Sequence, residues 1–127
     1  MSATILVADD SATMRMIVQS ALAEAGWRVL AAADGGAALS LAGREPVGLV
    51  VSDWNMPGMG GLELIRALRA SERYADVPIL VLSTEDDARD KDAARGLGVS
   101  GWLLKPVDPS VLVGMAAECL DAGRAYA

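Results

Sequence analysis

Residues 49–61 read LVVSDWNMPGMGG, and this stretch decides the fold class. The first four residues are apolar except for one serine, whereas a strand with one face in water alternates apolar and polar side chains. Such a run is typical of a parallel sheet that helices cover on both faces. The run stops at Asp53 and a glycine-rich loop follows, so we predict a strand over Leu49–Ser52 with a carboxylate at its carboxyl end.

The rest of the chain alternates apolar runs with amphipathic segments and contains no repeat or low-complexity tract. The other predicted strands are Thr4–Ala8, Arg28–Ala33, Pro78–Ser83 and Val99–Leu104. The predicted helices run from the cap residue Ser11 to Gly26, from the cap residue Asp34 to Gly43, and over Leu62–Ala70, Asp86–Leu97 and Pro109–Ala122. Five strands that alternate with five helices favour a doubly wound α/β domain with a five-stranded parallel sheet.

Composition narrows the class of protein. A chain of 127 residues, 53% of them hydrophobic, can bury the core of one domain, so we predict a single domain over residues 1–127 with no output domain. The N-terminus resembles no signal peptide and no apolar run approaches the ~18 residues of a membrane span, so we expect a cytoplasmic protein without membrane contact. The net charge of -6 argues against a nucleic-acid partner.

Three residue types narrow the chemistry further. The chain has no histidine, which removes serine-type triads, imidazole metal sites and a phosphohistidine of its own. The one cysteine, Cys119, excludes an internal disulfide, and the apolar helical pattern around it predicts a buried, inert thiol. Of the tryptophans, we expect Trp27 to pack after the first helix and Trp54 to be half-exposed beside Asp53.

Acidic, hydroxyl and basic residues end four of the five predicted strands. They are Asp9 and Asp10 after the first strand, Asp53 after the third, Ser83 and Thr84 at the end of the fourth, and Lys105 after the fifth. In a parallel sheet these ends lie along one edge, where ligands of doubly wound folds bind. Clustered carboxylates need a cation, because repulsion would otherwise protonate some of them. Mg²⁺ takes carboxylate and phosphate oxygens, and a lysine and a hydroxyl suit the other oxygens of a phosphoryl group.

With these residues the chain resembles the receiver domain of two-component response regulators. The motifs are DD after the first strand, DWNMPGMGG after the third, a Ser or Thr after the fourth and KP after the fifth, and they cover essentially the whole chain in the family's order. The nearest type is the stand-alone chemotaxis receiver of the CheY kind. The resemblance implies a flavodoxin-like (βα)5 fold with strand order 2-1-3-4-5, which places the first strand beside the third.

The resemblance also implies a phosphoryl acceptor and a metal site. Asp53 would be the nucleophile that takes a phosphoryl group from the phosphohistidine of a partner kinase. The Asp53 side chain, Asp10 and the backbone carbonyl of Asn55 would hold Mg²⁺, with Asp9 acting largely through water, and Mn²⁺ could substitute. The protein would then be a phospho-acceptor signalling protein rather than an enzyme, and it would catalyse only its own aspartyl phosphorylation and dephosphorylation.

Further residues take roles from the same resemblance. Ser83, Thr84 and Lys105 would surround the phosphoryl oxygens, and the Lys105–Pro106 peptide bond would be cis. Trp102 would be the aromatic switch that rotates when the loop after Ser83 moves. The residues two beyond Asp53 and two beyond Ser83 would tune hydrolysis; they are Asn55 and Glu85.

The resemblance implies partners and also shows departures. The partners would be a histidine kinase or histidine-phosphotransfer protein, and a downstream protein on the face formed by the fourth helix, the fifth strand and the fifth helix. Thr84 stands where the family usually has Ala or Gly, so we expect restricted access of water to the phosphoryl group. Residues 109–122 carry no Lys or Arg, so the lysines that receivers docking on the flagellar motor use on this face are missing. An alternative function is a phosphoryl shuttle or sink in a longer phosphorelay.

Overall fold

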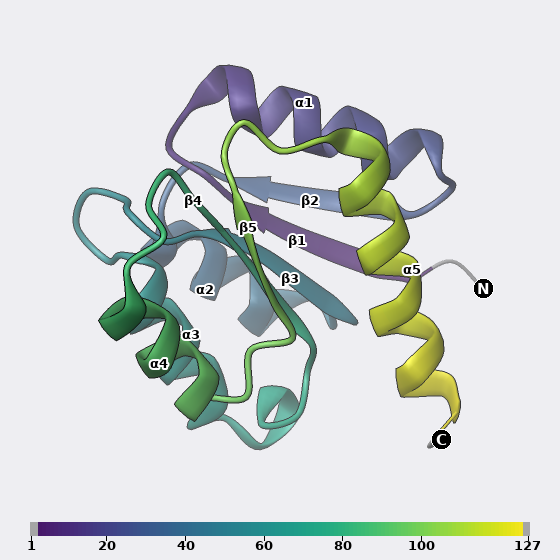
Figure 1. Cartoon of the computed structure of the whole chain (residues 1–127). Helices are drawn as coiled ribbons and strands as arrows, with labels where there is room; N and C mark the ends of the chain where they lie inside the picture. Colours follow the sequence, from purple (N-terminus) through teal and green to yellow (C-terminus); the bar gives the residue numbers. More distant parts are fainter. Residues whose placement is uncertain (1–2, 126–127) are drawn as a thin grey trace.

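The structure, a computed structural model, describes residues 3–125 and the side chains of residues 3–121. Strands and helices alternate along the chain (Figure 1). The strands are β1 (Thr4–Ala8), β2 (Arg28–Ala32), β3 (Leu49–Asp53), β4 (Ile79–Ser83) and β5 (Gly101–Leu104). The helices are α1 (Ala12–Glu24), α2 (Gly35–Arg44), α3 (Gly61–Arg69), α4 (Ala88–Gly96) and α5 (Pro109–Ala125), with a short 3-10 helix, η1 (Glu72–Tyr74), before β4.

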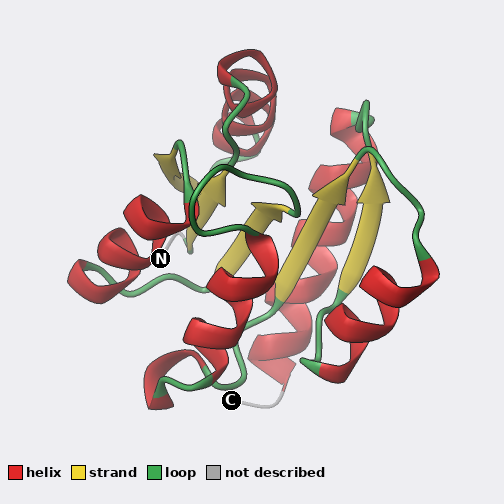
Figure 2. Cartoon of the chain, turned by 90° about the vertical axis from the view of Figure 1, so that its left-hand side faces the viewer, coloured by secondary structure: helices red, strands yellow, loops and turns green. Residues whose placement is uncertain are grey.

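The strands form one parallel sheet in the order β2-β1-β3-β4-β5. This is the predicted flavodoxin-like arrangement, and Figure 2 shows helices on both sides of the sheet. β3 is buried along its whole length, which agrees with its apolar sequence. The strand order reverses between β1 and β3, so their carboxyl ends border the crevice where ligands of doubly wound folds bind.

The core has two layers, one on each face of the sheet. Successive residues of a strand point to opposite faces, so Leu6 belongs to one layer and Ile5 to the other. The layer with Leu6 packs against α2, α3 and α4 through residues such as Leu64 and Ala94. The layer with Ile5 packs against α1 and α5 through residues such as Leu22 and Leu112. The sheet is therefore fixed from both sides, and only its edges and strand ends can carry a site.

Side-chain caps set where several helices begin. Ser11 Oγ accepts a hydrogen bond from the Met14 amide at 3.2 Å, and Asp34 Oδ1 accepts one from the Ala37 amide at 2.7 Å, so both predicted caps are confirmed. The fourth helix begins at Ala88 rather than at the predicted Asp86. The reason is that Asp87 is its cap and accepts hydrogen bonds from the amides of the next turn.

Other element bounds differ from the prediction by one to three residues. β5 begins at Gly101 rather than Val99, because the Val99 amide donates to Ala94 O and closes the end of α4. η1 was not predicted, since three residues show no periodicity. It places the buried ring of Tyr74 so that its hydroxyl donates to the carbonyl of Ala42 at 2.6 Å. This bond joins η1 to α2.

Cys119 and Trp27 test two packing predictions. Trp27 packs against the core layer on the α1 and α5 side, as predicted. Cys119 packs against the same layer but is half-buried rather than fully buried, because it lies at the border of the apolar stripe of α5. Burial raises the pKa of its thiol, which disfavours the reactive thiolate. Within residues 3–125, no helix has both the length and the apolar character that a membrane span requires.

Candidate functional site

The register of β1 on β3 brings the predicted carboxylates together. Ala8 is opposite Ser52, so the residues that follow, Asp9 and Asp53, lie side by side at the carboxyl ends of their strands. Asp53 is itself the last residue of β3, one residue beyond the predicted end. A carboxylate oxygen from each of Asp9, Asp10 and Asp53 lies within 4.8 Å of the other two. The sequence-predicted cluster therefore exists.

Lys105, the residue after β5, completes this cluster. Ser83 is opposite Leu104 in the β4–β5 pair, and the Lys105 amide donates to Ser83 O at 2.8 Å. The Lys105 side chain then reaches back across the strand ends. Its Nζ lies 3.0 Å from Asp9 Oδ2 and 3.2 Å from Asp53 Oδ2. The Lys105–Pro106 peptide bond is cis, as the family resemblance implied.

The acidic residues differ in burial, and burial changes the pKa of Asp53. Asp9 has no exposed surface and Asp53 is 5% exposed, whereas Asp10 is open to solvent. Burial raises the pKa of Asp53 from 3.8 to about 6; the positive charge of Lys105 opposes this rise, while the charge of Asp9 and a hydrogen bond with Asp10 add to it. Burial would lower the pKa of Lys105, but hydrogen bonds and charges from Asp9 and Asp53 together outweigh it and raise that pKa.

The donor set fits a divalent cation. Three carboxylates and one lysine leave a net charge of about -2 when all are ionised, and a divalent cation cancels it. Oδ2 of Asp9 is buried, and its contact among the described residues is the ion pair with Lys105 Nζ at 3.0 Å. Oxygen ligands at a partly open site suit a hard cation that keeps part of its water.

Backbone and arginine contacts hold Asp9 in place. Its Oδ1 accepts a hydrogen bond from the Ser11 amide at 2.9 Å, so the first turn of the loop orients the carboxylate. Arg15 on α1 donates to the Asp9 carbonyl at 2.7 Å. We did not single out Arg15 from the sequence. Its place one helical turn after the cap Ser11 is the only signal that could have indicated it.

The other predicted site residues lie around this cluster. Ser83 is fully buried, and its Oγ accepts a hydrogen bond from the Glu85 amide at 3.0 Å. Thr84 and Glu85 are exposed on the loop between β4 and α4. Asn55 is exposed beside Asp53, and its amide lies 3.4 Å from Asp53 Oδ1. Asn55 is thus next to Asp53, Ser83 ends the strand beside β3, and Thr84 and Glu85 lie on the loop that follows Ser83.

The glycines after β3 let the loop return close to the strand. Gly58 has a φ of +72°, which glycine adopts at little cost. A Cβ added at Gly61 would lie 2.9 Å from Cα of Trp54 and closer still to the carbonyl oxygen of Asp53. The Gly61 amide donates to Trp54 O at 2.9 Å. The start of α3 is thereby packed directly against the strand end that carries Asp53.

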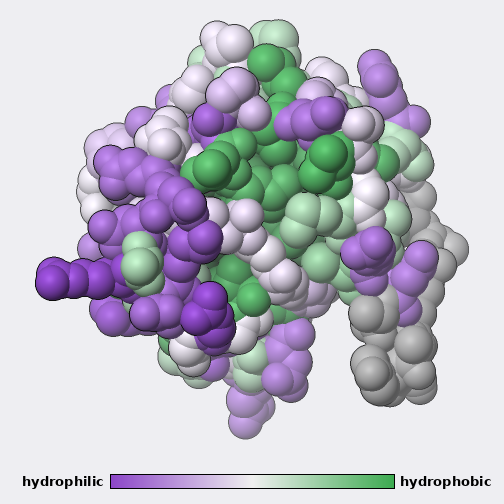
Figure 3. Space-filling view, in the orientation of Figure 1, coloured by the Kyte–Doolittle hydropathy of each residue, from purple (hydrophilic) through white to green (hydrophobic). Residues whose placement is uncertain are grey.

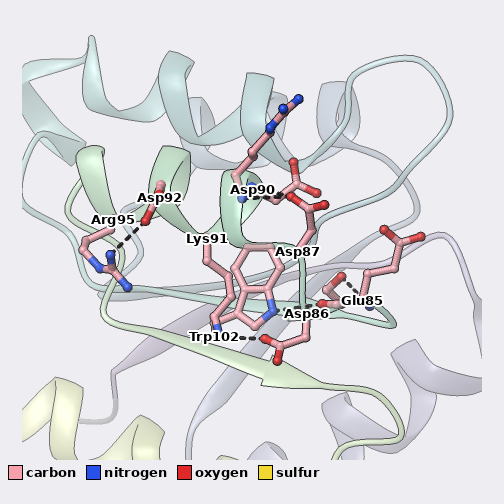
Figure 4. Close-up of polar contacts among 10 residues, drawn as sticks. Glu85, Asp86, Asp87, Asp90, Lys91, Asp92, Arg95 and Trp102 are labelled. Atoms are coloured by element: carbon pink, nitrogen blue, oxygen red, sulfur yellow. Dashed lines mark hydrogen bonds and ion pairs between the residues drawn. The ribbon is translucent and has the colours of Figure 1, made fainter.

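Trp54 is 8% exposed, so the expectation of a half-exposed ring was wrong. Its ring packs against that of Trp102 on β5, with the ring centroids 5.1 Å apart and the planes tilted by 55°. Figure 4 shows the Trp102 indole turned toward the loop before α4, where Nε1 donates to the Glu85 carbonyl at 3.1 Å. An aromatic pair therefore connects the residue after Asp53 with the loop after Ser83.

Comparison with known proteins assigns the family. The model of the response regulator receiver domain matches residues 5–117. The chain belongs to this family. Receiver domains bind a divalent metal and act in two-component signalling, and the fold and the acidic cluster agree with both properties.

Curated relatives and solved structures point to the chemotaxis type. The receiver is 39% identical over 121 residues to a CheY homolog of Campylobacter jejuni, and the match covers 94% of this chain and 93% of that protein. It shares 38% identity and a TM-score of 0.90 with the structure of chemotaxis protein CheY4 of Vibrio cholerae, over 94% of this chain and all of that one. A response regulator of Burkholderia multivorans shares 52% identity with a TM-score of 0.77, over 93% and 94% of the two chains.

Proposed function

We propose that this receiver takes a phosphoryl group on Asp53 from the phosphohistidine of a histidine kinase, with Mg²⁺ as the physiological metal. The observation that carries the proposal is the meeting of Asp9, Asp10, Asp53 and Lys105 at one edge of the sheet. A carboxylate oxygen of Asp53 forms a bond to phosphorus as the bond from phosphorus to the imidazole nitrogen breaks, and the released imidazole takes up a proton. The curated relatives named above are chemotaxis proteins, which favours a signalling switch over a shuttle in a longer relay.

The residues around Asp53 divide the work of charge neutralisation. Lys105 Nζ, which already faces Asp53 Oδ2, stabilises negative charge as it develops on the phosphoryl oxygens. Mg²⁺ held by Asp9, Asp10, Asp53 and the Asn55 carbonyl would neutralise the remaining charge on those oxygens. The Ser83 hydroxyl adds a hydrogen-bond donor at the end of the neighbouring strand. The protein remains a signalling protein, since the only bond it turns over is its own aspartyl phosphate.

The loop after β4 connects the chemistry to a partner. When Ser83 donates to a phosphoryl oxygen, the loop carrying Thr84 and Glu85 is drawn toward Asp53. Trp102 holds the Glu85 carbonyl and moves with it, so the surface next to α4 changes shape. Thr84, exposed beside Ser83, narrows the approach of water, and Asn55 and Glu85 flank the same opening and tune the rate of hydrolysis.

Intact mass tests the proposal directly. The protein is incubated with Mg²⁺ and a small-molecule phosphodonor, in parallel with Asp53→Asn and with an EDTA control. We expect a single phosphoryl adduct on the native chain and none in the other two samples. An adduct on Asp53→Asn would place the acceptor elsewhere, and an adduct of equal yield in EDTA would remove the metal from the reaction.

A further inference from the structure

The face formed by α4, β5 and α5 carries a polarity pattern that the phosphoryl chemistry does not use. Figure 3 shows hydrophilic side chains over α4 and an apolar area over β5 and the start of α5. Two large apolar side chains in this area are exposed, Leu104 at 49% and Val111 at 51%. Side chains of this size do not gain from contact with water, and an apolar area with a polar rim is typical of a protein-binding surface.

A groove of about 210 Å³ separates α4 from β5 on the same face. Ala94, Val99 and Trp102 supply its apolar wall, and Lys91 and Arg95 border it. The groove is large enough for one or two apolar side chains of a partner. Trp102 lines the groove and also donates a hydrogen bond to the Glu85 carbonyl. The shape of the groove therefore depends on the loop after Ser83.

The two bases beside the groove are already matched by acids of the same segment. Lys91 Nζ lies 2.6 Å from Asp86 Oδ1, and Arg95 Nη1 lies 2.9 Å from Asp92 Oδ1 (Figure 4). Both bases are therefore already paired within the chain and are not reserved for acidic residues of a partner protein. Both pairs are exposed, so each contributes little to stability and leaves the net charge of the surface unchanged.

The surrounding charge is strongly negative. Residues 85–122 contain eight acidic and four basic residues, and one of those bases, Lys105, lies in the carboxylate cluster. The start of α4 carries Glu85, Asp86, Asp87 and Asp90, while residues 109–122 of α5 carry acids such as the exposed Glu118 and no Lys or Arg. Such a surface repels nucleic acids, anionic membranes and acidic peptides, and it attracts positively charged peptides.

We propose that this face docks a basic, amphipathic segment of the downstream protein. Apolar residues of the segment cover Leu104 and Val111 and enter the groove beside Trp102, while its Lys and Arg residues face the acids of α4 and α5. This assignment rests on the proposed function, because phosphorylation of Asp53 reshapes the groove through Ser83 and Trp102.

A display selection followed by a binding assay tests the assignment. Random 16-residue peptides on phage are selected on the full chain with Mg²⁺ and a small-molecule phosphodonor, and one enriched peptide is labelled for fluorescence anisotropy. We expect enriched sequences with a net positive charge and at least two apolar residues. Enrichment of acidic or uncharged peptides, or no enrichment, would overturn the proposal.

Charge reversal locates the site. Asp90→Lys combined with Glu118→Lys changes the face, and Glu63→Lys combined with Glu24→Lys makes the same charge change in the first turn of α3 and at the end of α1. The first variant should weaken binding of the peptide at least about tenfold, and the second should weaken it less than about twofold. Melting curves show whether both variants are folded. Equal weakening by both variants would refute docking at this face.

Omission of the phosphodonor separates this proposal from the proposed function. If the charge-dependent binding persists unchanged without the donor and in Asp53→Asn, the basic docking surface stands and the phosphorylation switch fails. If Asp53 gains its phosphoryl adduct but the enriched peptides are acidic, the proposed function stands and the docking assignment fails.

Discussion

The buried carboxylate of Asp53 lowers the stability of the metal-free protein when it is ionised. Its pKa of about 6 lies above the 3.8 of an ordinary aspartate, chiefly because burial penalises its charged form. Between about pH 4 and pH 6 the folded state therefore holds the proton more tightly than the unfolded chain does. Stability falls as the pH rises through this window, and the full penalty of ionisation is present above it.

This gives a pH-dependent prediction for Asp53→Asn in EDTA. The amide carries no charge at any pH, so the variant should exceed the native chain in free energy of unfolding by about 1–3 kcal/mol at pH 8, with a smaller excess near pH 4. Urea denaturation across this pH range measures it, with exposed Glu72→Gln as a control that also loses one carboxylate. A constant difference at every pH would show that burial does not raise the pKa of Asp53.

Alanine substitutions at two helix glycines should change the stability of the protein in opposite directions. Gly61→Ala adds a methyl group against the backbone of Asp53 and Trp54, where something must shift, and should cost about 1–3 kcal/mol of stability. At Gly114, inside α5, an added Cβ meets no atom within 4 Å, so Gly114→Ala should gain about 0.5–1 kcal/mol through helix propensity. Melting curves of both variants check the signs, and a neutral Gly61→Ala would mean that the loop has room to move.

At the scale of elements, the sequence predicted the strands and helices that show a regular apolar pattern, and the polar residues at which a strand ends. Apolar strand runs followed by Asp9, Asp53 and Lys105 were enough to predict a parallel sheet with these residues along one edge, whereas the strand order came from the family resemblance. The bounds of α4 depended on which of two adjacent aspartates is the cap, and only the hydrogen bonds of Asp87 decide this. Trp54 was misplaced because its burial depends on a ring from β5, a contact that no local pattern encodes.

Arg69, at the end of α3, ties together several elements at the edge of the sheet opposite the carboxylates. Its guanidinium donates to four backbone carbonyls from η1, the approach to β4 and the end of α4; they are Tyr74, Val77, Leu97 and Gly98. Removal of the side chain takes away all four of these hydrogen bonds at once. The amino-terminal end of α4, in contrast, follows the loop after Ser83, which phosphorylation would move under the proposed function, so Arg69 would anchor the end that stays in place.

Arg69→Ala should therefore destabilise the protein by about 2–4 kcal/mol, because several hydrogen bonds from a charged donor are lost together. Arg69→Lys should recover only part of this, since an ammonium group cannot reach the carbonyls as a planar guanidinium does. Arg66→Ala, an exposed arginine of the same helix, controls for the loss of charge and should change stability by less than about 0.5 kcal/mol. Equal effects of the two alanine variants in urea denaturation would contradict the anchoring role.

At the scale of the whole molecule, metal binding and folding should be linked, because the proposed ligands come from the ends of different strands. Asp9 and Asp10 follow β1 and Asp53 ends β3, so the cluster exists only in the folded sheet. A cation that binds the folded chain alone raises the melting temperature by mass action. At a Mg²⁺ concentration ten times the dissociation constant, the gain is about 1.4 kcal/mol, or about 3–7 °C for a domain of this size.

Asp10→Asn separates this effect from general screening by salt. Asp10 is exposed and makes no ion pair with Lys105 among the described contacts, so its loss should leave the metal-free melting temperature within about 2 °C. The shift with Mg²⁺ should nevertheless shrink by more than half, because a carboxylate ligand is lost. Glu63→Gln on α3 should keep the full shift, and NaCl of equal ionic strength should not reproduce it. An Asp10→Asn protein that responds to Mg²⁺ as the native chain does would place the cation elsewhere, and the net charge of the cluster would then have to be balanced by protonation of Asp53.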